Sequence, residues 1–152
     1  SDVETLLSKV HFQGLTPLGA SLERKIISPY LGKQHIGPKP LLVMILTDGE
    51  PTGEPPSHFA SVVENVKNYL SRSPCGKGAL SIQIAQLGKD QKAQAFLAYL
   101  DNHPRIDDMI DATSYYELEA EEFKRKGIEL TPEMWLMKLC LGSIDPDIDA
   151  QD

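Results

Sequence analysis

An aspartate directly after a run of apolar residues is the feature of this sequence that most clearly suggests chemistry. The segment LLVMILTDGEPT, residues 41–52, has six apolar residues in a row, followed by a threonine, Asp48 and a glycine. Exposing the apolar run to water is costly, and so is burying an unpaired carboxylate. The pattern therefore predicts a buried strand that brings Asp48 to an edge where a positive group is held. An Asp-Gly pair that only forms a turn is the alternative.

The elements that must position Asp48 alternate between helix and strand. Helical patterns cover residues 1–10, 17–30, 57–70, 90–103, 117–127 and 131–142, and strand patterns cover residues 41–46, 79–88 and 108–113. This alternation predicts an α/β fold, a Rossmann-like open parallel sheet with helices on both faces. In such sheets ligands bind at the carboxyl ends of the strands, which is where Asp48 lies.

Local signals refine these elements. Thr16, Ser57 and Asp90 stand where side chains commonly cap helices, and Thr16 is followed by a proline suited to a first turn. The strand at residues 41–46 shows no alternation of polar and apolar residues. We therefore expect both of its faces to be covered by helices.

Composition limits the possible partners and organisation. The 152 residues are 41% hydrophobic and 24% charged, which predicts one globular domain at residues 1–143 and an acidic tail at 144–152. The net charge of -7 argues against nucleic acid as a partner, and no apolar stretch is long enough to span a membrane. Cys75 and Cys140 are too few for a disulfide framework, so we expect a reducing compartment such as the cytoplasm.

Two segments together resemble the von Willebrand factor A domain, in its fungal-type form. They are GLTPLGASL, residues 14–22, and LLVMILTDGEPT; the later segments LSIQIAQLG, IDDMIDATSY and WLMKLCLGSID follow in the order of the family's last strands and closing helix. The family binds protein partners through a metal-ion-dependent adhesion site made of three loops. The resemblance implies that Thr16 and Asp48 are metal ligands for Mg²⁺ or another divalent cation, with Glu50 near the site.

One part of the family pattern is missing. No Asp-x-Ser-x-Ser, the first ligand loop, occurs in these residues, so the chain is expected to correspond to the C-terminal portion of such a domain. In the family, the strand at residues 41–46 pairs with the first strand of the domain. The resemblance therefore implies an exposed sheet edge, to be paired with a second copy of the chain or with a complementing chain.

The function expected from these features is that of a metal-dependent protein–protein interaction module and not of an enzyme. In the family, an acidic residue of the protein partner commonly completes the metal site. Two alternatives stay open: a metal-independent structural half-domain that folds with a complementary chain, and a Mg²⁺-dependent phosphatase-like hydrolase. In the hydrolase, Asp48 is the nucleophile and Glu50 the second acid.

Overall fold

The centre of the molecule is a parallel sheet of three strands. The computed structural model describes residues 15–32, 40–74 and 76–141. Strands β1 (Leu41–Thr47), β2 (Leu80–Gln86) and β3 (Ile110–Thr113) lie in the order β1-β2-β3, and both pairs are parallel. The predicted α/β class with an open parallel sheet is confirmed. The predicted helix at residues 1–10, Cys75 and the predicted tail at residues 144–152 lie outside the described residues.

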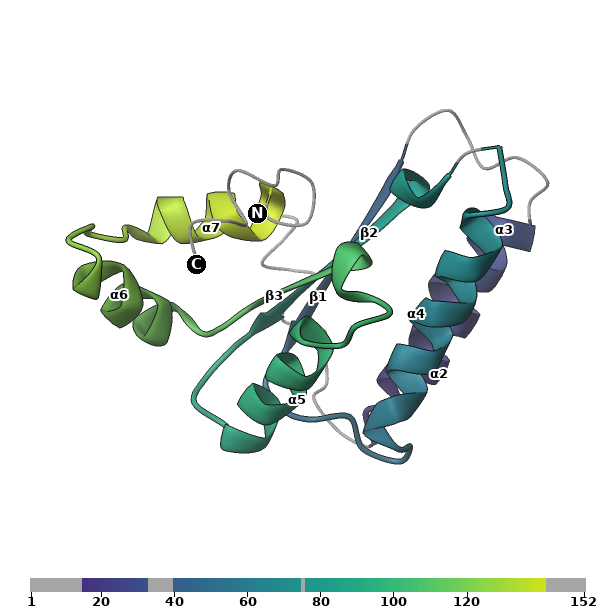
Figure 1. The fold of residues 1–152 in the computed structure, drawn as a ribbon. Helices are drawn as coiled ribbons and strands as arrows, with labels where there is room; N and C mark the ends of the chain where they lie inside the picture. The colour runs from purple at the N-terminus through teal and green to yellow at the C-terminus, as the bar shows by residue number, and fades with distance from the viewer. Residues whose placement is uncertain (1–14, 33–39, 75, 142–152) are drawn as a thin grey trace, which may run out of the picture.

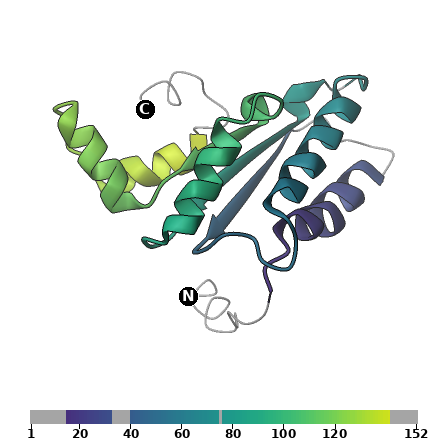
Figure 2. The ribbon, with the colours of Figure 1, turned by 60° about the horizontal axis from the view of Figure 1, so that its bottom comes forward.

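Helices lie on both sides of this sheet. The first described helix runs as α2 (Leu18–Leu22), a π-helical segment η1 (Glu23–Ile27) and α3 (Ser28–Gly32), and it is followed by α4 (Pro56–Leu70), α5 (Gln91–Asp101), α6 (Tyr116–Arg125) and α7 (Pro132–Leu141). Short 3₁₀ turns, η2 (Lys77–Ala79) and η3 (Asp107–Met109), precede β2 and β3. Figures 1 and 2 show α2 and α4 side by side, with α6 and α7 as a separate pair.

The main core lies between one face of the sheet and the helices α2, α4 and α5. Phe59 and Val63 of α4, Ile82 and Ile84 of β2, and Leu100 of α5 are all completely buried. Burying one such side chain contributes about 1.5–3 kcal/mol, so this cluster fixes the helices on the sheet. The prediction that Ser57 caps α4 is wrong: the helix begins at Pro56, and its N-cap position is Pro55, with no side-chain cap. Proline suits a first turn because it needs no hydrogen-bond partner there.

Polar groups are buried on the opposite face, where α7 contacts β2. Gln83 of β2 is fully buried, and its Nε2 donates a hydrogen bond to Thr113 Oγ1 at 3.0 Å. Lys138 of α7 pairs with Glu119 of α6, with 2.8 Å between Nζ and Oε2, and both side chains are buried. The first contact joins β2 to β3, and the second joins α6 to α7.

The prediction that helices cover both faces of β1 is wrong for the part of the chain that the structure describes. Val43 and Ile45 pack against the main core, but Met44 and Leu46, on the opposite face, are 43% and 56% exposed. The reason is that α7 lies over β2, one strand further into the sheet. β1 is also an edge strand, since β2 is its only strand neighbour among the described residues.

None of the described helices combines the length and the apolar character that a membrane crossing requires.

Candidate functional site

The loop after β1 lies at the carboxyl edge of the sheet, where the sequence predicts a site. The Thr47 hydroxyl donates a hydrogen bond to the carbonyl of Gly49 at 2.8 Å, and Leu87 N donates to the carbonyl of Thr47 at 2.7 Å. These bonds hold the start of the loop against the end of β2. Asp48 itself is exposed, and its carboxylate forms no hydrogen bond or ion pair with another described residue.

The fold brings Thr16 to this same loop. Thr16 N donates to Thr52 Oγ1 at 2.8 Å, and Thr52 N donates to the carbonyl of Thr16 at 3.0 Å. The two residues are 36 positions apart in the chain, so only the tertiary structure makes this pairing. The prediction that Thr16 caps the helix is wrong, because α2 has no side-chain cap from its own preceding residues. Thr16 is exposed, and its hydroxyl has no hydrogen-bond partner among the described residues.

Glu54 takes the capping position that was predicted for Thr16. Its Oε1 accepts a short hydrogen bond from Gly19 N, and its Oε2 accepts one from Ala20 N at 3.1 Å. His58 Nδ1 lies 2.9 Å from the same Oε2. Burial raises the pKa of the Glu54 carboxyl, but the two backbone N–H groups and His58 outweigh burial and lower this pKa below its ordinary value.

Sequence reasoning missed this role of Glu54. A carboxylate is favoured at a helix N-terminus because the N–H groups there are unpaired and the helix dipole is positive. Local patterns detect such a cap only when it stands within a few residues of the helix. Glu54 is 35 positions from Gly19, so no local signal could identify it.

The predicted near-site residue Glu50 contacts a neighbouring helix. Its Oε1 lies 3.0 Å from Nζ of Lys92 on α5, and the hydrogen bond and charge of Glu50 raise the pKa of Lys92. The pair joins the loop to α5. Glu50 is only two residues from Asp48 in the chain, but its carboxylate is paired with the ammonium group of Lys92.

A buried amide oxygen at the same edge was also missed. Gln86 ends β2, pairs in register with Thr47 and is completely buried. Its Nε2 donates to the carbonyls of Gly88 and Asp90 at 3.0 and 2.9 Å, whereas its Oε1 has no partner among the described residues. A buried acceptor without a partner costs about 1–3 kcal/mol. A glutamine inside a strand pattern gives no sequence signal for such a position.

The described residues fit a divalent cation only in part. Thr16 and Asp48 offer unpaired oxygen atoms from two adjoining loops, whereas the carboxylates of Glu50 and Glu54 are engaged. Among the residues that the structure describes, no three His, Cys, Asp or Glu side chains come together as a metal site. Mg²⁺ prefers near-octahedral oxygen coordination and keeps several waters when the protein supplies few ligands. Two ligands alone would hold such an ion weakly, with water in most of its coordination positions.

Comparison with known proteins finds no relative of this chain. No family model matches the chain, and neither a curated protein nor a solved structure matches it.

Proposed function

We propose that this chain is a protein–protein interaction module that binds through β1. The supporting observation is that β1 is an edge strand in the described sheet and exposes Met44 and Leu46 on its uncovered face. An unpaired edge presents backbone N–H and C=O groups to any incoming strand, and pairing buries the apolar side chains beside it. In a monomeric protein such an edge promotes aggregation. In a protein that forms a complex, it serves as a binding surface.

The partner that we propose for this edge is a second copy of the chain. Two β1 edges related by a twofold axis make the same contacts in both directions, which is the commonest form of assembly. Antiparallel pairing about this axis puts Met44 and Leu46 of both copies on one side of a continuous sheet. A complementing polypeptide that supplies a strand fits the same edge and is the alternative partner.

Light scattering coupled to size-exclusion chromatography tests the proposed assembly. At micromolar concentration we expect a dimer. We expect Met44→Lys and Leu46→Lys to give monomers, because each removes an apolar contact beside the paired edge and places positive charges of both copies on the same side of the sheet. Ile128→Lys is the matched control, since Ile128 is 42% exposed, similar to Met44 at 43%, and lies after α6. A wild-type monomer would contradict self-assembly and leave the complementing chain as the partner.

Dependence on a divalent cation is the second part of the proposal. It is supported by the resemblance to the von Willebrand factor A domain and by the Thr16–Thr52 pairing, which joins the two expected ligand loops. Thr16 and Asp48 would hold Mg²⁺ at the carboxyl edge of the sheet. When bound, the ion supplies an open coordination position for an Asp or Glu carboxylate of the partner.

Calorimetric titration with Mg²⁺ tests this part separately. We expect weak saturable binding that is lost in Asp48→Asn and weakened in Thr16→Ala, with Glu121→Gln on α6 as an exposed acidic control. Assembly that is unchanged by EDTA would favour the metal-independent structural half-domain, because that alternative requires pairing at β1 and no cation.

We also propose that the chain binds a partner and does not catalyse a reaction. A phosphatase mechanism needs Glu50 as a free second acid beside Asp48, and Glu50 is paired with Lys92. Phosphatase activity that disappears in Asp48→Asn would contradict a purely binding role.

A further inference from the structure

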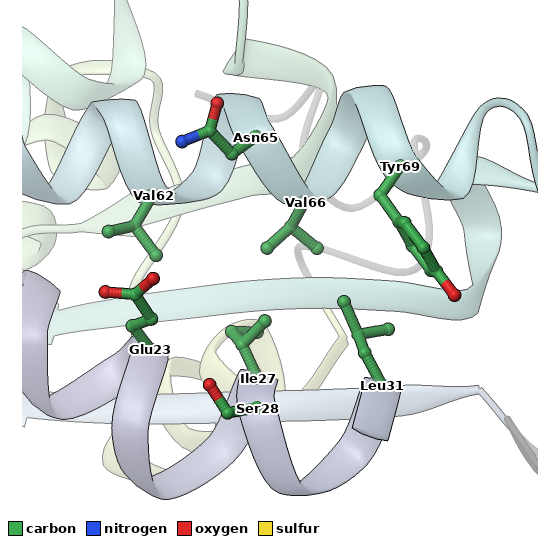
Figure 3. Close-up of a pocket in the computed structure, with 8 residues that line it drawn as sticks. All are labelled: Glu23, Ile27, Ser28, Leu31, Val62, Asn65, Val66 and Tyr69. Carbon is green, nitrogen blue, oxygen red and sulfur yellow. The ribbon is translucent and has the colours of Figure 1, made fainter. Parts of the chain in front are cut away.

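A groove of about 410 Å³ lies between the helix α2–α3 and helix α4. Figure 3 shows side chains from the two helices facing one another along it, with Glu23 opposite Val62 at one end and Leu31 near Tyr69 at the other. Ile27 lies opposite Val66 in the middle. The groove is formed by the helices on the main-core face of the sheet, whereas Met44 and Leu46 lie on the other face, so the two surfaces are separate.

The groove has an apolar floor and a polar rim. Ile27, Val62 and Val66 form the floor and are only 4–5% exposed. The rim includes Tyr69, which is 52% exposed, and the exposed Asn65. An apolar floor with polar groups at its margin is the usual composition of a surface that receives an amphipathic segment.

One wall of the groove contains the π-helical segment η1. Its wider turn is closed by a hydrogen bond from Ser28 N to the carbonyl of Glu23, five residues earlier. The extra residue shifts the helix, so that Ile27 is buried where an uninterrupted helix favours Ile26. π-helical turns are rare, and they occur frequently at functional sites. Glu23 and Ile27 of η1 and Leu31 of α3 line the groove.

Charges differ at the two ends. Of the described residues that line the groove, only Glu23 and Tyr69 have ionisable side chains. Glu23 has no ion-pair partner in that part of the chain. Past Tyr69 the surface continues into a neighbouring hollow lined by Asn68 and Arg72. Arg72 has no ion pair within the described part of the chain either. Within the described residues, the groove therefore has a carboxylate without an ion pair at one end and a guanidinium without an ion pair beyond the other.

We propose that this groove binds a short amphipathic helix of a partner protein, with a Lys or Arg at the Glu23 end and an Asp or Glu at the Arg72 end. From Glu23 to Leu31 the wall extends eight residues, which is about 12 Å, or two helical turns. Two apolar side chains one turn apart on the incoming helix match that length. The opposite charges at the two ends fix the direction of the helix.

An NMR titration of the ¹⁵N-labelled chain with a designed peptide tests this proposal. The probe is an alanine-rich helix that carries Lys, Leu, Leu and Glu in that order, each about one turn from the next. We expect saturable shifts of the backbone signals of Glu23, Val66 and Tyr69, with a Kd on the order of 0.1–1 mM. Shifts that stay linear up to about 5 mM peptide, or shifts confined to β1, would overturn it.

Charge reversal provides the sharper comparison. Glu23→Lys should weaken binding of this peptide about three- to tenfold, because one exposed attraction becomes a repulsion. Exchanging the Lys and Glu of the peptide should remove the preference for the wild type. Glu121→Lys changes the net charge equally on α6 and should bind like the wild type. Equal binding by all three proteins would overturn the proposed orientation and site. Met44→Lys should bind the peptide normally, so failure at β1 and failure at the groove are distinguishable.

Discussion

At the scale of single residues, Glu54 connects the loop after β1 with the start of α2. Its carboxylate accepts hydrogen bonds from Gly19 N and Ala20 N and lies beside His58, with only 6% of the side chain exposed. Charge-assisted bonds of this kind are stronger than neutral ones, and a helix N-terminus favours a negative partner. The position of the loop that holds Asp48 therefore depends on Glu54, although Glu54 is not a predicted ligand.

Replacing Glu54 tests this dependence. We expect Glu54→Gln to lower the free energy of unfolding at pH 7 by about 1–3 kcal/mol, because the amide loses the charge that the two N–H groups stabilise. The folded pKa of Glu54 lies below its ordinary value of 4.5, so its stabilisation is present above pH 4.5 and is lost as the pH falls through the folded pKa. Urea titrations of both proteins at pH 7 and at acid pH measure this, and a difference that does not shrink in acid would contradict it.

Gly19 is required for the close approach of α2 to α4. A Cβ atom at this position would lie 2.9 Å from Phe59 N and 3.0 Å from Phe59 Cα, and backbone atoms cannot move aside cheaply. We expect Gly19→Ala to destabilise the protein by about 1–3 kcal/mol in spite of the higher helix propensity of alanine. Gly78→Ala is the control, because no heavy atom lies within 4 Å of the added methyl group. Similar melting temperatures for the two variants would refute the close approach.

At the scale of elements, the junction of α6 and α7 depends on a buried ion pair. Lys138 and Glu119 have side chains that are 5% and 6% exposed, and Glu119 also accepts a hydrogen bond from Ser114 N at 3.0 Å. Breaking such a pair from one side leaves an uncompensated buried charge. The junction is therefore sensitive to loss of either partner.

We expect Lys138→Met to lower the free energy of unfolding by about 3–5 kcal/mol. Adding Glu119→Gln to this variant should restore part of the loss, because the amide removes the buried charge and still accepts the bond from Ser114 N. Chemical denaturation of the two single variants and the double variant gives the coupling energy. A double variant no more stable than Lys138→Met would show that the buried charge is not the cause.

At the scale of the whole molecule, the central strand and the β1 edge of the sheet differ in how they are protected. β2 has neighbours on both edges and is buried almost throughout, whereas β1 has an edge without a strand partner and an open face in the described structure. Protection of backbone amides follows burial and hydrogen bonding. Backbone amides of β1, where we propose that a partner binds, are thus expected to be less protected than those of β2.

Hydrogen exchange at several protein concentrations measures this asymmetry. We expect β2 to exchange slowly at every concentration. The amides of β1 that point away from β2 should become protected as the concentration rises, because pairing at the edge gives them hydrogen bonds. In Met44→Lys, the protection of these amides should stay low. Slow exchange of these amides in the most dilute sample would contradict an edge that needs a partner.

The sequence by itself determined the elements and the α/β class. The alternation of apolar patterns identified the three strands and predicted Asp48 at a carboxyl edge. Asp90 could be identified as a helix cap because its carboxylate accepts a hydrogen bond from Ala93 N, only three residues along the chain. Each of these features depends on neighbours in the chain, since helix and strand periods and local caps are short-range properties.

Only the tertiary structure decided which faces and which carboxylates are free. Leu41–Thr47 is apolar enough for burial on both faces, but α7 packs over β2 and leaves Met44 and Leu46 exposed. Likewise, Glu54 and Thr52 form hydrogen bonds with the segment around Thr16, although they are more than thirty positions away in the chain. Contacts at that separation depend on how whole elements pack, and the packing of elements is not encoded in any one local pattern.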